Sequence, residues 1–319
     1  MRRSISLIAL VLACVTSTVF AQNLTGKKVL LIDSYHEGYE WSDGIVRGLK
    51  NGLTGSGIVL DILRLDTKNN PGEDFKKQAG LKAKAYIEQT KPDLVVAADD
   101  NAANYIIVPF FKNSSIPFIS VGVNWDASAY GFPYKNLTAM IEVSLVSQLI
   151  ANMKDYAKGD RLGFITGDSE TERKELKYYK QLFNIPFTSE KLVKTFAEWK
   201  TEYRKMAGSV DMIFFGNNAA IKDWDAKEAA DWIAQYTKIP SGTINDYMMP
   251  FTMVGMAKLS DEFGVWSAQT AKKILAGASP ADIPMVKNEQ TKLMLNVALA
   301  TKAGIVFKPA LLKNATIVK

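Results

Sequence analysis

The chain has 319 residues, of which 47% are hydrophobic and 23% charged, a composition that is ordinary for a globular protein. Its formal net charge of +6 is modest, and the lysines are spread along the chain instead of forming one stripe, which argues against nucleic acid as a partner. A mature chain of about 300 residues exceeds the usual size of one hydrophobic core, so we expect two domains.

The N-terminus is typical of an export signal. Arg2 and Arg3 give it a positive start, residues 5–20 are mainly apolar, and small residues precede a cleavage site after Ala21. We therefore expect residues 1–21 to be a cleaved signal peptide and the mature protein to lie in the periplasm. The apolar run is too short and too interrupted for a membrane span of roughly 20 residues.

Cysteine usage leaves one alternative for this end of the chain. Cys14 is the single cysteine, and residues 11–13 before it fit a lipoprotein cleavage box poorly, so a lipid anchor at Cys14 is the alternative interpretation. Cleavage after Ala21 would leave a mature chain without cysteine. That would exclude disulfides, thiolate metal ligands and cysteine nucleophiles.

Short apolar runs alternate with helical periodicity through the first half of the chain, which is the pattern of βα units around a parallel sheet. The expected strands are 29–32, 58–65, 94–97 and 117–121. The expected helices are one with Ile45, Val46 and Leu49 on its buried face, then 75–90 and 101–111. The loop at the carboxyl end of each strand carries polar or aromatic residues.

A second, similar series begins near residue 138. Its expected strands are 162–166, 192–195, 212–215 and 242–244. Its expected helices are one capped by Ser144, then 171–183, 198–207, 226–236 and 263–276, before a last section at 291–319. The sequence thus predicts an α/β protein with two doubly wound lobes. We expect one lobe at 24–141 plus 252–288 and the other at 142–251 plus 289–319.

Several stretches carry a family resemblance. They are the opening KKVLLIDSYHEGYEWSDGIVRGLK, the βα units that end at IPFISVGVN, the segment KNLTAMIE, and the ending. In the ending, KILAGASPADIP is followed by an Asn-containing strand, an AGI helix and a short apolar strand. Over nearly the whole mature chain, the sequence resembles the substrate-binding proteins of the tryptophan/tyrosine-type ABC transporter family.

The resemblance implies a type I periplasmic-binding-protein fold, in which two parallel-sheet lobes joined by a multi-crossover hinge close on a ligand. It also implies a monomer without a cofactor, which presents its closed form to an ABC permease in the inner membrane. One departure from the family is the loop Ala98-Asp99-Asp100-Asn101, where members often carry a small hydroxyl residue or alanine. The family resemblance therefore does not fix the ligand.

The residues themselves place the site at the carboxyl ends of the strands, where ligands bind in open α/β sheets. The loops there are rich in aromatic and acidic side chains and contain no Lys or Arg. Such a cleft favours an ammonium or a hydroxyl-rich ligand over an anion, and its aromatic rings can stack on an apolar or planar group. The candidate ligand-binding residues are Ser34, Tyr35, His36, Tyr39, Trp41, Asp99, Asp100, Asn101, Asn124, Trp125, Asp168, Asn217, Asn218, Asp246 and Tyr247.

If the ligand is an amino acid, its carboxylate must rest on helix N-terminal NH groups near Ser34, Ser42 or Ser169. Some candidates also have a purely structural alternative. Those that follow a strand can cap the next helix instead of touching ligand, and they are Asp100, Asn101, Asp168 and Asn218. Tyr35 and Trp41 could cover the edge of a lobe.

The motifs argue against catalysis and against a metal. His36 is the only histidine, whereas a zinc site needs three or four ligands dominated by His and Cys. The chain has no G-x-S-x-G elbow, no P-loop and no G-x-G-x-x-G after its first strand. We therefore expect an exported solute-binding protein of an ABC importer that traps an amino acid or amine-like ligand, aromatic ones included. The alternative is a periplasmic sensor that acts in trans on a membrane receptor or kinase.

Overall fold

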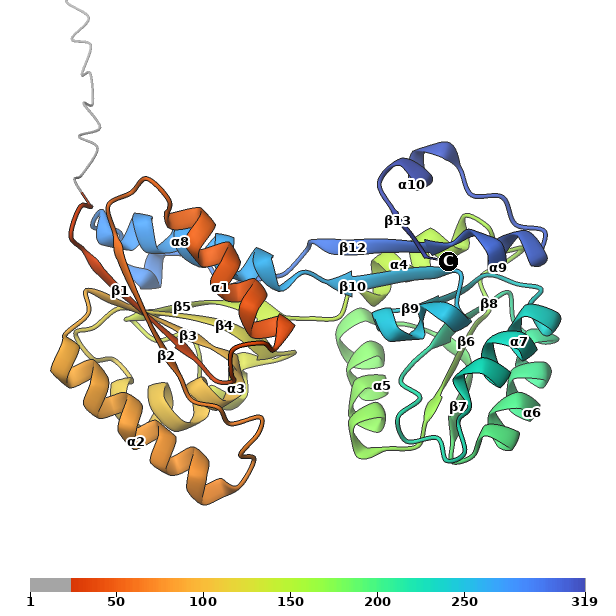
Figure 1. Cartoon of the computed structure of the whole chain (residues 1–319), viewed down its shortest axis with the longest axis horizontal. Coiled ribbons are helices and arrows are strands. Elements are labelled where there is room, and N and C mark those ends of the chain that lie inside the picture. Colours follow the sequence, from red (N-terminus) through yellow and green to blue (C-terminus); the bar gives the residue numbers. More distant parts are fainter. Residues whose placement is uncertain (1–23, 319) are drawn as a thin grey trace, which may run out of the picture.

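Two separate β-sheets organise the chain, and each forms the centre of one lobe (Figure 1). The computed structural model describes residues 24–318, so the expected signal peptide and Cys14 lie outside the described residues. We call the six-stranded sheet with its helices lobe I and the seven-stranded sheet with its helices lobe II. No helix within 24–318 is both long enough and apolar enough to cross a bilayer.

Lobe I has parallel strands in the order β11-β5-β4-β3-β1-β2. They are β1 (Lys28–Asp33), β2 (Val59–Arg64), β3 (Leu94–Ala98), β4 (Phe118–Asn124), β5 (Leu137–Glu142) and β11 (Val286–Lys287). Its helices are α1 (Glu40–Leu53), α2 (Glu73–Thr90), α3 (Asp99–Ala102), the π-helix η1 (Ala103–Phe111), the 3-10 helices η2 (Ala127–Tyr130) and η4 (Pro280–Asp282), and α8 (Ser260–Leu275). The strand order reverses between β1 and β3, which makes their carboxyl ends the topological switch point of this sheet.

Lobe II repeats the same order of its first five strands in the sheet β13-β12-β10-β9-β8-β6-β7. Its strands are β6 (Leu162–Gly167), β7 (Phe187–Val193), β8 (Met212–Phe215), β9 (Ser241–Thr243), β10 (Val254–Lys258), β12 (Thr291–Asn296) and β13 (Thr316–Val318). Its helices are α4 (Val146–Lys154), α5 (Glu170–Phe183), α6 (Phe196–Ala207), α7 (Ala226–Tyr236), the 3-10 helix η3 (Asp246–Phe251), α9 (Val297–Lys302) and α10 (Pro309–Lys313). Only β10 and β12 pair antiparallel.

The described chain passes between the lobes three times. It leaves lobe I after β5, returns to it between β10 and α8, and leaves it again between β11 and β12. Figure 1 shows β10 and β12 side by side where they connect the two lobes. The expected boundary at residue 252 differs from this arrangement, because β10 pairs in the sheet of lobe II and the chain enters lobe I only after Lys258.

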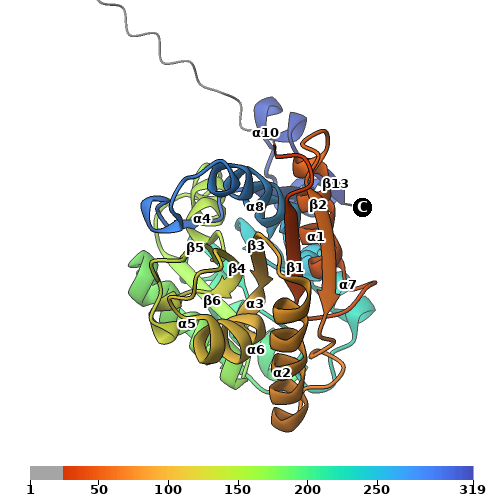
Figure 2. The same ribbon diagram turned by 90° about the vertical axis from the view of Figure 1, so that its left-hand side faces the viewer.

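Helices α1 and α8 cover one face of the lobe I sheet, and α2 and α3 lie on the other (Figures 1 and 2). The backbones of α1 and α8 approach closely through glycine. A Cβ atom on Gly48 would lie 2.1 Å from the carbonyl oxygen of Asp261, and one on Gly264 would lie 2.1 Å from that of Ile45. Since α8 directly follows β10, this contact fixes the point at which the chain re-enters lobe I.

Most expected elements are present, and the differences have local causes. The predicted strand at 192–195 lies earlier, at β7, and the predicted helix at 101–111 is a short α-helix followed by a π-helix that contains Pro109. Ser144 does not cap α4, whose N-cap is Leu145 without a side-chain hydrogen bond. β10 was not predicted, because Gly255 and Lys258 interrupt the apolar pattern of this five-residue strand.

Candidate ligand-binding cleft

A cleft of about 460 Å³ opens at the carboxyl ends of β1 and β3 and faces the segment of lobe II that follows β9. Lobe I contributes Tyr35, Tyr39, Glu40, Trp41, Asp99, Asn124, Glu142 and Ser260. Lobe II contributes Ile244, Asn245, Asp246, Tyr247, Ala257 and Lys258. The cleft therefore lies at the switch point of lobe I, next to two of the three chain crossings.

Asp99 is the most unusual residue of the cleft. It directly follows β3 with a φ of 72°, a left-handed conformation that few residues other than glycine adopt, and it is only 2% exposed. Its Oδ1 atom accepts a hydrogen bond from Trp41 Nε1 at 2.9 Å. Its Oδ2 atom is buried and has no partner within residues 24–318. Burial, and then the nearby Glu142 carboxylate, raise the pKa of Asp99 well above its usual value.

A glycine in the neighbouring strand leaves space for the Asp99 carboxylate. Gly122 in β4 has a φ of 74°, and a Cβ atom there would lie 3.0 Å from Asp99 Oδ1. A larger residue would therefore press on the carboxylate and would also be strained in its own backbone.

A buried ion pair joins the cleft to the crossings between the lobes. Glu142, the last residue of β5, is 7% exposed and pairs with the ammonium group of Lys258, the last residue of β10. Burial raises the pKa of Glu142, and Lys258 partly opposes that rise. The same ammonium lies 5.7 Å from the centre of the Trp41 ring.

Lys258 corrects the expectation of a cleft without basic side chains. The loops after the strands do lack Lys and Arg, but this lysine comes from β10, a strand that the sequence pattern does not predict. The only sequence pattern that could have predicted β10 is the run Val254 to Lys258. This run is too short and too interrupted to be distinguished from a loop.

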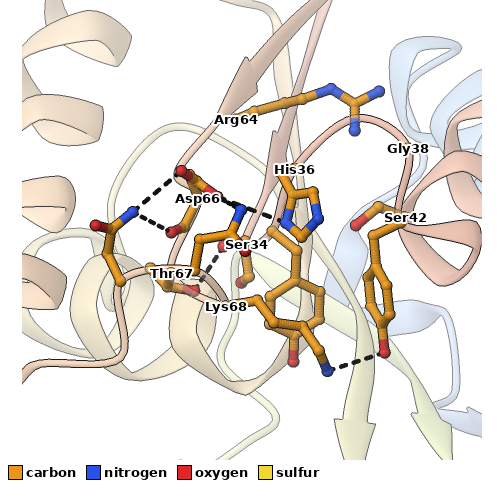
Figure 3. Close-up of polar contacts among 12 residues, drawn as sticks. Ser34, His36, Gly38, Ser42, Arg64, Asp66, Thr67 and Lys68 are labelled. Carbon is orange, nitrogen blue, oxygen red and sulfur yellow. Dashed lines mark hydrogen bonds and ion pairs between the residues drawn. The ribbon is translucent and has the colours of Figure 1, made fainter.

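Aromatic rings line one side of the cleft. Tyr35 and Tyr39 contact edge to face, with ring centres 5.4 Å apart, and Trp41 packs on Phe263 of α8 at 5.2 Å. The Lys68 ammonium lies 4.3 Å from the centre of the Tyr39 ring and donates a hydrogen bond of 3.0 Å to the Tyr39 hydroxyl (Figure 3). Lys68 thus covers the outer side of these tyrosines with a cation.

Three of the candidate residues on lobe I stabilise loops beside the cleft instead of lining it. The Ser34 hydroxyl donates to the Ala98 carbonyl at 2.5 Å and accepts from the Ala102 amide at 3.0 Å, which holds α3 against β1. His36 Nδ1 lies 3.5 Å from Asp66 Oδ1 (Figure 3), and Asn101 donates to the Thr67 hydroxyl at 2.8 Å. These contacts tie the first loop to α3, and both of them to the segment after β2.

Asp100 and Trp125 also have protein partners. Asp100 accepts hydrogen bonds from Asn124 Nδ2 at 2.6 Å and from the Tyr130 hydroxyl at 2.7 Å. Trp125 is buried against α5 of lobe II, where its ring stacks on Tyr178 at 5.5 Å and its Nε1 donates to Glu175 at 2.9 Å. The indole is therefore a contact between the lobes and not part of the cleft wall.

On lobe II the predicted residues divide into two groups. Asp246 and Tyr247 line the cleft, and Tyr247 is 51% exposed there. The others do not line it. Asp168 pairs with Arg173, while Asn217 and Asn218 form the turn after β8.

Two of the serines named for a ligand carboxylate already have partners. The Ser42 hydroxyl donates to Asp33 at 2.7 Å, and Ser169 caps α5 by accepting from the Glu172 amide at 3.2 Å. The N-terminus of α1 has no side-chain cap. The residues that the structure describes contain no group of three or more His, Cys, Asp or Glu side chains that could hold a metal ion.

Comparison with known proteins agrees with this architecture. A solved substrate-binding protein with adhesive properties from Clostridium difficile, in its ligand-free open form, shares 17% identity and covers 92% of this chain and 99% of its own, with a TM-score of 0.70. An ABC domain from Streptococcus pneumonia in complex with L-Trp shares 18% identity over 92% and 100%, with a TM-score of 0.54. A periplasmic ribose ABC transporter from Conexibacter woesei shares 12% over 92% and 99%, with a TM-score of 0.53.

These likenesses establish the type I periplasmic-binding-protein fold. No curated protein matches the sequence. The model of the family described as ABC transporter substrate binding protein matches residues 40–319, which is most of the chain. The chain therefore belongs to the family of ABC transporter substrate-binding proteins.

Proposed function

We propose that this protein is the exported substrate-binding protein of an ABC importer, and that it traps a small amino-acid or amine-like ligand between its lobes. The observation that supports this most is the unpartnered oxygen of the buried Asp99, a residue that lines the interlobe cleft. A buried acceptor without a donor costs free energy, and a ligand that supplies the donor recovers it.

The mechanism is a ligand-driven shift from open to closed. A ligand shifts this equilibrium only if it binds the closed form more tightly, which requires contacts to both lobes. The cleft offers Asp99 and Trp41 from lobe I and Tyr247 from lobe II as such contacts. The closed form, released from its signal peptide into the periplasm, would then dock on a permease in the inner membrane.

A thermal-shift screen of the mature protein tests the proposal. The panel contains amino acids, amines, nucleosides, sugars and simple anions. A ligand that binds only the folded state at 100 times its Kd adds about 2.7 kcal/mol to the free energy of unfolding and raises the melting temperature. We expect a shift from an amino acid or amine, and recovery of that ligand unchanged. A shift from simple anions alone, or turnover of the ligand, contradicts the proposal.

Reconstitution with the permease tests the transport step. We expect the ligand-bound protein to stimulate ATP hydrolysis by its permease in proteoliposomes, whereas a sensor acting in trans would bind ligand without stimulating it.

A further inference from the structure

The ionisable side chains that line the cleft are mostly acidic. Four acidic side chains and one basic side chain line it. Glu142 pairs with Lys258, and the exposed Glu40 pairs with Arg47 at 3.0 Å. The other two, Asp99 and Asp246, have no ion-pair partner within the described residues. One of them belongs to lobe I and the other to lobe II.

A positive charge between the lobes would interact favourably with both of these carboxylates. It would donate to the Asp99 Oδ2 atom and reduce the repulsion between Asp99 and its acidic neighbours Glu142, Asp33 and Asp100. Closure would bring Asp246 from the facing lobe toward the same charge. The attraction is strong in a cleft from which closure expels water, because the local dielectric falls.

A ligand carboxylate finds no comparable partner there. Lys258 is already paired, and Arg64 is bonded to Asp33 at 2.7 Å and to Asp43 at 3.3 Å. Lys68 is exposed, does not line the cleft and lies over the rings of Tyr35 and Tyr39.

The nearby helix N-termini are equally unsuited to a carboxylate. Their first turns already carry acidic side chains, which oppose the positive end of the helix dipole. These residues are Glu40 and Asp43 on α1, Glu170 and Glu172 on α5, and Asp261 and Glu262 on α8.

We infer that the ligand is a small organic amine of net positive charge without a carboxylate, whose ammonium group binds Asp99 Oδ2 and faces Asp246 in the closed form. The inference rests on the proposed function and narrows its ligand class. Trp41, held by its bond to Asp99 and its packing on Phe263, presents an aromatic ring beside that ammonium. The exposed Tyr247 ring on lobe II is available for the apolar part of the ligand.

Isothermal titration of the mature protein with matched pairs tests this. The pairs are tryptamine with L-tryptophan, tyramine with L-tyrosine, and putrescine with L-ornithine, so that the members of each pair differ only in a carboxylate. We expect the amine of at least one pair to bind about 100-fold more tightly than its partner, as like charges in a desolvated site cost several kcal/mol. Equal or tighter binding of the carboxylate member overturns the inference and leaves the solute-binding function standing.

Two variants locate the contact. Asp99→Asn keeps an acceptor for Trp41 and tolerates a left-handed backbone, and it should weaken amine binding about 10- to 100-fold, the range of a lost charged hydrogen bond. Asp246→Asn should weaken it less. Asp168→Asn is the matched control, because it removes the same charge outside the cleft, and it should leave affinity unchanged. Full affinity in a folded Asp99→Asn variant overturns the inference.

The remaining outcomes also separate the two proposals. If no amine or amino acid binds but a sugar or nucleoside of the screening panel does, the inference is overturned together with the proposed ligand class, and only the solute-binding role stands. If nothing in the panel or the pairs binds, both are contradicted.

Discussion

Asp99 is favourable for binding and unfavourable for the stability of the ligand-free protein. Burial raises its pKa, so the ionised form is destabilised relative to the unfolded chain. A carboxyl whose pKa is raised on folding contributes most at low pH and loses that contribution as the pH rises through the raised pKa. The Glu142 carboxyl, whose pKa is also raised, acts in the same direction.

The Asp99→Asn variant should therefore be more stable than the wild type without ligand at pH 8. The gain should be about 1–3 kcal/mol, because the amide buries no charge, and it should shrink as the pH falls toward 5 and the Asp99 carboxyl becomes neutral. Urea unfolding at both pH values measures it. Asp211→Asn is the control, and it should lower the stability at pH 8 instead of raising it. Hydrogen bonds from Arg161 lower the pKa of Asp211, so its ionised form stabilises the folded protein. A destabilised Asp99→Asn at pH 8 would contradict this explanation of the site.

At the scale of elements, the contact between α1 and α8 sets the position of the re-entry into lobe I. It depends on glycines spaced four apart, Gly44, Gly48 and Gly52, whose missing side chains let α8 approach. These glycines can be read from the sequence, but their spacing does not indicate which other element they contact. Their role becomes visible only once the partner helix, more than 200 residues later, is placed beside them.

Gly48→Ala should lower the free energy of unfolding by about 1–3 kcal/mol, the usual effect of overpacking, because the added methyl group would meet the α8 backbone. Gly208→Ala is the matched control. Its backbone is right-handed, with a φ of −88°, and the nearest atom to a Cβ there is 3.6 Å away. Chemical denaturation measures both variants, and equal stability of Gly48→Ala and wild type would show that the helices can separate freely.

Some helices and strands could be predicted from the sequence and others could not. The helical pattern predicted α7 and a short apolar run predicted β8, each with the bounds that the structure has, 226–236 and 212–215. Short elements were missed, β10 above all, and with it Lys258. The left-handed backbone of Asp99 has no signal in the sequence, since the same Ala-Asp-Asp-Asn run could cap a helix in an ordinary conformation. Loop aromatics could be placed near a cleft, but not assigned to one lobe.

At the scale of the whole molecule, Trp125 shows why the sequence cannot assign a loop aromatic residue to the lobe that its ring contacts. It follows β4 of lobe I, yet its ring lies on Tyr178, Tyr179 and Phe183 of α5 in lobe II. Its amide donates to the Glu142 carbonyl at 2.8 Å, next to the first crossing. This contact therefore ties the two lobes together next to the first crossing.

Trp125→Ala should cost about 3–5 kcal/mol of folding free energy, as usual for truncation of a buried tryptophan. Trp125→Phe keeps a ring against Tyr178 but loses the bond to Glu175, and should cost about 1 kcal/mol. Denaturant unfolding separates these outcomes. If Trp125→Ala retained wild-type stability but lost ligand binding, the residue would belong to the cleft, as the sequence alone suggested.

Closure of the lobes around a bound amine is the central claim, and small-angle X-ray scattering tests it most directly. The radius of gyration of the mature protein should fall when the tightest amine found by titration is added at saturation, and it should not fall for Asp99→Asn at the same concentration. An unchanged radius of gyration for the wild type with saturating ligand would contradict ligand trapping between the lobes.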